Sequence, residues 1–214
     1  MERALSSPQN VQGTYDKFSS FYDLLFKRYL EQGREKAIRQ LAPTAGTKVL
    51  EIGVGTGLSF DFYPEDIKLI AFDYSLGMLK VSKKKGNSSK KFELNLLQMD
   101  AQNMAFKNNT FDRILAAYVL TVVPSPEDAI DEIFRVARPG AKVIIVNHLK
   151  SRNKILGAIE DVLHPMFSGI GLFNLNRDLI TVLSDKGAKN IKVEPATFLK
   201  THHIIAFEVP DSLS

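Results

Sequence analysis

Short apolar runs rich in β-branched residues alternate along this chain with segments whose apolar residues recur at helical spacing. This alternation predicts a mostly parallel sheet with helices on both faces, because strands buried on two faces read as continuous apolar runs. Strands are expected at residues 48–52, 68–72, 92–98, 111–117, 142–147, 191–198 and 202–208, and helices at 18–41, 75–85, 126–137 and 176–186. The last two strands leave no room for a helix between them, so they should form an antiparallel hairpin.

The composition fits one globular domain over residues 1–214, with 44% hydrophobic and 24% charged residues. No apolar run reaches the roughly 18 residues that span a bilayer, and the first ten residues lack the apolar core of a secretory signal. The chain has no cysteine, which excludes disulfides, thiolate nucleophiles and cysteine-bound zinc. We expect a cytosolic domain, although the absence of cysteine is also compatible with export.

The formal net charge of +4 gives a modest attraction toward phosphate-rich partners. The charge alone does not separate nucleic acid from anionic lipid. No appended basic domain or base-reading motif accompanies it, which disfavours nucleic acid. Lysines cluster between residues 83 and 91, where a solvated surface loop or an anion-binding patch is expected.

Residues 49–57, Val-Leu-Glu-Ile-Gly-Val-Gly-Thr-Gly, run from an apolar strand straight into a glycine-rich turn, and a helix or helical turn should follow. Glycine lets the backbone turn sharply and lets a ligand approach amides that a Cβ would block. In such sheets, ligands bind outside the carboxyl ends of the strands. The spacing is G-x-G-x-G, which differs from the G-x-G-x-x-G of dinucleotide-binding loops and disfavours NAD.

Three carboxylates stand at the ends of three successive predicted strands. Glu51 precedes the first glycine, where a pyrophosphate would be repelled and an ammonium group attracted. Asp73 can accept hydrogen bonds from both hydroxyls of a ribose, and Asp100 can accept from the amino group of adenine. Together they describe one ligand that carries a cation, a ribose and an adenine.

With these features, residues 46–148 resemble the class I S-adenosylmethionine-dependent methyltransferases. The resemblance implies an α/β fold with a Rossmann-like, seven-stranded, mostly parallel sheet and a C-terminal antiparallel hairpin. It also implies S-adenosylmethionine as cofactor and S-adenosylhomocysteine as product. The residues assigned to the cofactor are Glu51, Gly53, Gly55, Thr56 and Gly57 near the methionine part, Asp73 at the ribose, and Asp100, Ala101, Tyr74 and Met78 at the adenine. For Met78, a place in the hydrophobic core is the alternative.

Methyl transfer from a sulfonium is an in-line displacement that needs an aligned nucleophile and no metal. The fourth and fifth predicted strands lead to Tyr118 and to Asn147 with His148, where this family places substrate-facing residues. The Asn-Pro-Pro-Tyr motif of enzymes that methylate adenine or glutamine is absent at Tyr118, which disfavours those substrates. His148 would bind a phosphate, assist proton removal because its ordinary pKa is near neutrality, or simply cap the strand.

Two segments are candidates for substrate recognition. Residues 14–34 place aromatic and apolar side chains at helical spacing among lysines and arginines. This amphipathic region, within residues 1–41, would pack on the domain, cover the cofactor as a lid, or lie in a lipid interface. Residues 150–175 are apolar and interrupted by glycines, which suits an insertion that contacts acyl chains, or a part of the core.

The Tyr-Asp-x-Phe-x-x-x-Tyr-Asp opening, the pair Gly33 and Arg34, and the Val-Asn-His end of the fifth strand are similar to the soluble bacterial phosphatidylethanolamine N-methyltransferases. That resemblance implies methylation of phosphatidylethanolamine and its methylated intermediates toward phosphatidylcholine, at the inner face of the cytoplasmic membrane. The catalytic residues would be Tyr15, Tyr22, Tyr118 and His148, with Asn147, His148, Arg152 and Arg177 at the substrate phosphate. Tyrosine faces stabilise a growing ammonium charge.

Alternatives stay open, because the same cofactor half also serves methyltransferases of quinones, sterols and small soluble amines. A module that binds the cofactor without catalysis is a further alternative. The expected partners are a phospholipid substrate and an anionic membrane surface, which the N-terminal amphipathic helix would contact. Neither nucleic acid nor a metal ion is expected.

Overall fold

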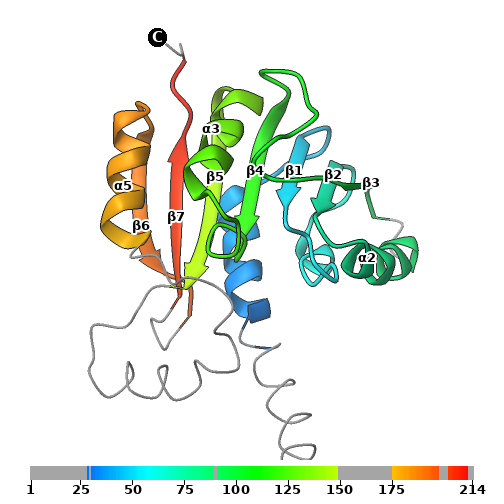
Figure 1. Ribbon diagram of the computed structural model, residues 1–214. Helices are drawn as coiled ribbons and strands as arrows, with labels where there is room; N and C mark the ends of the chain where they lie inside the picture. The colour runs from blue at the N-terminus through cyan, green and yellow to red at the C-terminus, as the bar shows by residue number, and fades with distance from the viewer. Residues whose placement is uncertain (1–27, 29, 89–90, 149–174, 198–201, 212–214) are drawn as a thin grey trace, which may run out of the picture.

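The computed structural model describes residues 28, 30–88, 91–148, 175–197 and 202–211. In this part of the chain, one seven-stranded sheet has the order β3-β2-β1-β4-β5-β7-β6 (Figure 1). The strands are β1 (Lys48–Ile52), β2 (Lys68–Asp73), β3 (Glu93–Gln98), β4 (Phe111–Ala117), β5 (Ala137–His148), β6 (Lys189–Pro195) and β7 (His202–Glu208). The Rossmann-like sheet predicted from the sequence is confirmed.

The first five strands run parallel, whereas β7 runs antiparallel to both β5 and β6. The predicted C-terminal hairpin is thus confirmed, with β7 lying between β5 and β6. Strand β5 begins at Ala137, earlier than predicted, because Ala137 pairs with Phe111 before a register shift in the ladder with β4. Since parallel strands end at the same edge, the residues that follow β1, β2 and β4 meet there.

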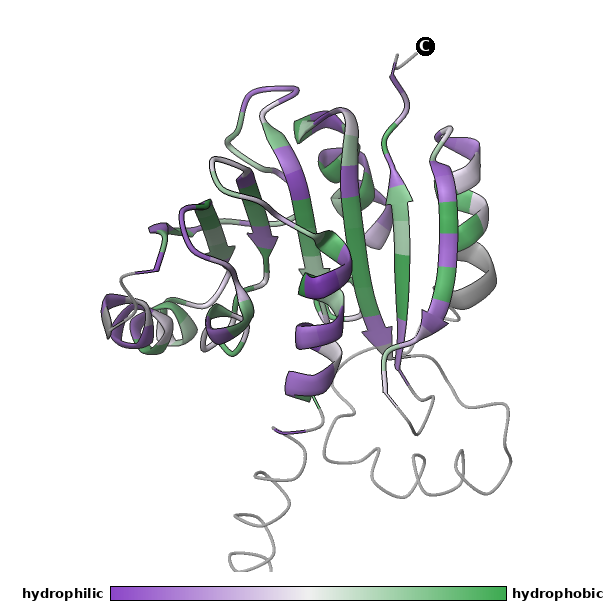
Figure 2. Cartoon of the chain, turned by 180° about the vertical axis from the view of Figure 1, so that it is seen from behind, coloured by the Kyte–Doolittle hydropathy of each residue, from purple (hydrophilic) through white to green (hydrophobic). Residues whose placement is uncertain are grey.

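Helices cover both faces of this sheet. On one face lie α3 (Pro126–Val136) and α5 (Leu175–Asp185), and on the other lie α2 (Leu76–Ser88) and the helix over residues 30–41 (Figures 1 and 2). The short helix η1 (Phe60–Phe62) follows the glycine turn, as expected. Among the described helices, none is long and apolar enough to cross a membrane.

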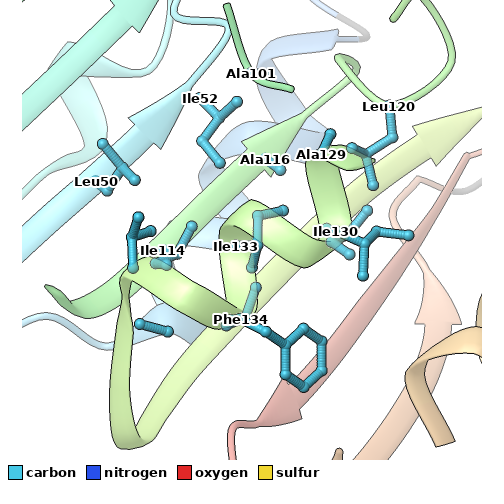
Figure 3. Packing of buried hydrophobic residues seen from close by; sticks show 14 of the residues in the cluster. Leu50, Ile52, Ala101, Ile114, Ala116, Leu120, Ala129, Ile130, Ile133 and Phe134 are labelled. Atoms are coloured by element: carbon cyan, nitrogen blue, oxygen red, sulfur yellow. The ribbon is translucent and has the colours of Figure 1, made fainter. Parts of the chain in front are cut away.

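Helix α3 shows how the sequence sets an element. The hydroxyl of Ser125 caps its first turn by accepting from the backbone N–H of Asp128, and Pro126 follows as the first helical residue. The apolar stripe of the helix enters the core beneath the sheet, as Figure 3 shows for Ala129, Ile130, Ile133 and Phe134. Each large side chain buried there contributes about 1.5–3 kcal/mol.

The helix predicted over residues 75–85 is confirmed and extends further, so the first part of the lysine-rich stretch is helical and does not form the surface loop that its charge suggested. Helix α2 extends to Ser88, and Lys83, Lys84 and Lys85 lie on it. The helix continues because its inner face, which includes Leu79 and Ser82, is buried. Lys85 forms an ion pair of 2.9 Å with Asp61 of η1.

The described part of the N-terminal helix packs on the domain. Figure 2 shows it crossing the sheet with hydrophilic residues outward. Arg113 Nε donates to the carbonyl of Leu41 at 3.1 Å, and Lys36 Nζ donates to the carbonyl of Pro195 at 2.7 Å. The buried residues of this helix are Gly33, Arg34, Ala37, Ile38 and Leu41. Packing is therefore confirmed for residues 30–41, while the aromatic stripe before residue 28 lies outside the described residues.

Candidate active site

The turn after β1 has a left-handed backbone at each of its glycines, with φ of 68° at Gly53, 56° at Gly55 and 76° at Gly57. A Cβ on Gly53 would lie 2.8 Å from Val119, and one on Gly57 would lie 2.6 Å from Phe60. Packing therefore requires these two glycines. In the described part of the chain, a Cβ on Gly55 would meet no atom within 4 Å, which leaves open space for a ligand beside the middle of the turn, next to the partly exposed Thr56.

Asp73, the last residue of β2, connects this strand to the glycine turn by a hydrogen bond. Its Oδ2 accepts from the backbone N–H of Gly55 at 2.8 Å, and its Oδ1 accepts from the N–H of Ser75 at 2.9 Å. A carboxylate oxygen can accept a second hydrogen bond, so both oxygens keep capacity for the hydroxyls of a ribose. The structure thus brings Asp73 and the glycine turn together, as the sequence predicts.

Asp100 lies just beyond β3 and is oriented by Gln102. Oδ1 of Asp100 accepts from the backbone N–H of Gln102 at 2.9 Å and from its side-chain amide at 3.1 Å. Oε1 of Gln102 in turn accepts from the backbone N–H of Ser125, at the start of α3. The side chain of Ala101 is 5% exposed and belongs to the core (Figure 3), so its predicted contact with adenine would have to be made by its backbone.

Two exposed side chains follow Asp73 along the chain. Tyr74 comes directly after β2, and Met78 lies in the first turn of α2. Tyr74 is 76% exposed and Met78 is 45% exposed. The core alternative for Met78 is therefore wrong. Both side chains are free to cover the plane of a bound base, which is the role that the family resemblance assigns to them.

Glu51, in contrast, is withdrawn from solvent, with 1% of its surface exposed. Its Oε2 accepts a hydrogen bond of 2.8 Å from the hydroxyl of Ser59. Burial raises the pKa of Glu51 to about 7, although the Ser59 hydrogen bond and the charge of Arg34 act in the opposite direction. Burial and the charge of Glu51 also raise the pKa of Tyr63. The predicted contact of Glu51 with the ammonium group of the cofactor stays a prediction.

Tyr118 follows β4 with φ of 63°, in the left-handed region. The guanidinium carbon of Arg34 lies 4.7 Å from the centre of its ring, and the ring of His202 meets it edge-on at 5.3 Å. A cation of the protein itself therefore covers one face of the tyrosine. A substrate could therefore contact Tyr118 only away from the face that Arg34 covers. The catalytic role assigned to Tyr118 stays a prediction.

Asn147, near the end of β5, is fully buried, and neither Oδ1 nor Nδ2 of its side chain finds a hydrogen-bond partner among the residues that the structure describes. Leaving buried amide atoms unpaired costs about 1–3 kcal/mol. In the strand register, Asn147 stands opposite His203 of β7, and His148 stands opposite His202. A polar group that entered here would meet an unused donor and an unused acceptor.

Comparison with known proteins adds the family. A family model described as a methyltransferase domain matches residues 50–145. The chain is also 34% identical, over 162 residues, to a phosphatidylethanolamine N-methyltransferase of Cereibacter sphaeroides, with 75% of this chain and 79% of that protein covered. The chain belongs to the class I S-adenosylmethionine-dependent methyltransferases. Its cofactor is S-adenosylmethionine and its product S-adenosylhomocysteine.

The methyltransferase has other relatives. It is 31% identical over 144 residues to a demethylmenaquinone methyltransferase of Paenarthrobacter aurescens, with 64% of this chain and 54% of that protein covered. The chain thus spans little more than half the length of that relative. A solved structure from Thermotoga maritima, described as a methyltransferase and possible histamine N-methyltransferase, matches with a TM-score of 0.67 at 21% identity and covers 91% of this chain and 98% of that chain. At this identity the likeness concerns the fold alone.

The residues of this methyltransferase fit its cofactor. The open side of Gly55, the acceptor oxygens of Asp73 and the exposed rim at Tyr74 and Met78 lie along one edge of the sheet. These groups offer space, acceptors for hydroxyls and an apolar cover, as a ribose with an attached base requires. In the part of the chain that the structure describes, no group of three or more potential metal ligands occurs.

Several predicted substrate residues lie outside the described residues. These are Tyr15, Tyr22, Arg152 and residues 150–174 of the predicted insertion at 150–175. His148 ends β5 and Arg177 lies in α5, but neither side chain is among those described. The roles assigned to all of them stay predictions.

The sequence analysis assigned no role in this methyltransferase site to Arg34, Ser59 or Gln102, although Arg34 belongs to one of the motifs that carry the family resemblance. Arg34 stands on the buried stripe of its helix, where a cation is unexpected, and that position was the available signal. Ser59 ends the glycine-rich loop, but its hydrogen bond to Glu51 and that of Gln102 to Asp100 depend on packing, so the sequence does not reveal these contacts.

Proposed function

We propose that this methyltransferase transfers methyl groups to the nitrogen of phosphatidylethanolamine and of its methylated intermediates. The observation that carries the proposal is the similarity to the Cereibacter sphaeroides enzyme, which extends over 162 residues. Residues 50–145, which the family model matches, are too few to account for an alignment of this length. The similarity therefore includes chain outside the matched domain, and its identity of 34% is above the 31% of the demethylmenaquinone methyltransferase relative.

When bound, the cofactor supplies a methyl group on a positively charged sulfur. The protein has to hold that group in line with an amine and keep water away. Asp73 and the glycine turn form one hydrogen-bonded unit, which suits the first task. The amine must lose its proton before attack, and the proposed proton acceptor is His148 at the end of β5.

The buried amide of Asn147 supports a zwitterionic substrate. Its Nδ2 is a donor, which suits a phosphate oxygen, and its Oδ1 is an acceptor, which suits the N–H of an amine. A phosphoethanolamine head group carries both kinds of partner. A substrate that used both atoms would also remove the energetic penalty of the unpaired amide.

A membrane surface is the proposed partner. The net charge of +4 favours anionic lipid, and the lipid amine is presented only at such a surface. We propose peripheral attachment at the inner face of the cytoplasmic membrane, with the amphipathic N-terminal region as the contact. Binding of this kind should weaken as the ionic strength rises.

Methylation of a quinone is the second candidate, favoured by the demethylmenaquinone methyltransferase relative. A quinone carries carbonyl or hydroxyl groups in place of a phosphate and an amine, so it brings no charge to the Asn147 amide. The two candidate substrates therefore differ in the groups that they would bring to Asn147 at the end of β5.

The test incubates purified protein and labelled S-adenosylmethionine with vesicles that contain phosphatidylethanolamine, phosphatidylglycerol and demethylmenaquinone, and then resolves the lipids. Labelled mono-, di- or trimethylated phosphatidylethanolamine is expected, and label in menaquinone instead would overturn the proposal. Asp73→Ala is the negative control, because it removes the acceptors of the site. Asp61→Asn, at an exposed acid that pairs with Lys85, is the matched variant that should stay active.

A further inference from the structure

Arg34 is a buried cation that has no anionic partner in the described part of the chain. Only 8% of its surface is exposed, and its Nη1 atom is buried and finds no hydrogen-bond acceptor among the described residues. More exposed arginines do have such partners, since Arg39, Arg135 and Arg138 each form an ion pair with a carboxylate. Removing a charge from water without compensation opposes folding, so an unpaired donor of this kind points to a ligand.

The contact that the structure does give to this guanidinium is with an aromatic ring. Its central carbon lies 4.7 Å from the centre of the Tyr118 ring. That ring is held from two sides, because its hydroxyl lies against Gly33 and the ring of His202 meets it edge-on at 5.3 Å. The stacking fixes the plane of the guanidinium, but a ring face accepts no conventional hydrogen bond from the N–H groups at its edge. These groups, those of Nη1 among them, are left for another partner.

Tyr118 also places this cation beside the glycine turn. Its neighbour Val119 packs so closely on Gly53 that a Cβ added to the glycine would lie 2.8 Å from the valine side chain. The backbone N–H of Tyr118 donates to the carbonyl of Val146 in β5 at 2.7 Å, which holds the residue at the edge where the parallel strands end. Arg34 therefore lies near the carboxyl ends of β4 and β5, where ligands of such sheets bind.

We infer that Arg34 binds an oxyanion of a ligand at this edge of the sheet. The planar guanidinium matches a carboxylate or a phosphate with two parallel hydrogen bonds, and the attraction is strong where water is excluded. The ligand thus supplies the anion that the described part of the chain does not.

Two ligands carry such a group. One is the cofactor, whose amino-acid end has a carboxylate and is assigned by the family resemblance to the glycine turn. The other is the phosphate of the lipid, and this source rests on the proposed function. The packing of Val119 on Gly53 favours the carboxylate, because it brings Tyr118 and the guanidinium above it close to that turn.

The first arm of the test compares, by calorimetry, the affinities for S-adenosylhomocysteine and for its decarboxylated analogue, which keeps the ammonium group. The parent protein should bind the compound with the carboxylate about ten- to a hundredfold more tightly, as expected for charge-assisted hydrogen bonds. Arg34→Gln should abolish this preference. Because a ratio of two affinities is compared, a variant that only loosens the fold would weaken both compounds and leave the preference intact.

The second arm titrates glycerophosphoethanolamine and ethanolamine, which differ in the phosphate, into protein saturated with S-adenosylhomocysteine. A preference for the phosphate compound that Arg34→Gln abolishes, with the first preference intact, would assign the oxyanion to the lipid. Loss of the first preference supports the inference even if phosphatidylethanolamine is not methylated in the vesicle assay. If neither preference depends on Arg34, the inference is overturned.

Arg39→Gln is the matched control, because this arginine lies on the same helix, has a side chain that is 76% exposed and pairs with Glu35. It should keep the preferences of the parent protein. Arg34→Lys keeps the charge without the planar pair of donors, so it should reduce the preference at least about threefold. Preferences as large as those of the parent in Arg34→Lys would contradict the inference even where Arg34→Gln does not fold.

Discussion

The hydroxyl of Tyr118 and the α-carbon of Gly33 are in such close contact that a Cβ added to the glycine would lie 2.2 Å from the tyrosine oxygen. The two residues are far apart in the sequence, one on the N-terminal helix and the other just after β4. Their contact sets how closely the helix approaches the sheet. It also explains why a glycine stands inside a helix, where it is normally unfavourable.

Gly33→Ala should lower the free energy of unfolding by about 1–3 kcal/mol, the usual cost of overpacking a well-filled interior. Adding Tyr118→Phe should recover most of that loss, because the next ring atom would be 3.5 Å from the new methyl group. Urea unfolding followed by circular dichroism measures both. Gly77→Ala is the control, since the nearest atom to its Cβ would be 3.5 Å away; a double variant as unstable as Gly33→Ala would contradict the proposed clash.

Asp73→Asn should weaken binding of S-adenosylmethionine by about ten- to a hundredfold, because charge-assisted hydrogen bonds contribute about 1.5–3 kcal/mol. The asparagine keeps the shape of the side chain, but only one of its two terminal atoms accepts, so the N–H of Gly55 or that of Ser75 loses its partner. Calorimetric titration measures the affinity. Asp61→Asn should bind like the parent protein, and equal affinities for the two variants would rule out this role for Asp73.

The stability of the protein should fall as the pH rises from about 5 to about 7. The pKa of Glu51 in the folded state is about 7, above its ordinary value of 4.5, so between these values the folded protein retains a proton that the unfolded chain has released. The contribution of this group should fall by up to about 3 kcal/mol over that range and then stay level. Urea titrations at several pH values measure it, with Glu51→Gln as the comparison; a parallel pH profile in that variant would show that another group is responsible.

Much of this fold could be predicted from the sequence, because its strands are buried on two faces and read as apolar runs. β1, β4 and β7 begin and end at the predicted residues. The sequence also indicated Asp73 and the glycine turn, since both belong to a local motif with a fixed spacing. It did not reveal Arg34 against Tyr118, because that contact depends on how a helix crosses the sheet. For the same reason it ended the helix at residue 85, whereas α2 extends to Ser88.

Asn147 offers the sharpest separation of stability from function. Both atoms of its buried amide lack partners within the described ranges of the chain. Asn147→Leu, which has a similar volume and no polar atoms, should therefore leave the free energy of unfolding unchanged or raise it by about 1 kcal/mol. The same change should raise the KM for phosphatidylethanolamine vesicles at least about tenfold, because the substrate would lose its donor and its acceptor. Urea unfolding and the vesicle assay are measured on the same preparation, with cofactor affinity as the control. A less stable protein with normal KM would mean that Asn147 serves the fold, whereas a more stable one with impaired substrate binding would place a polar ligand at the end of β5.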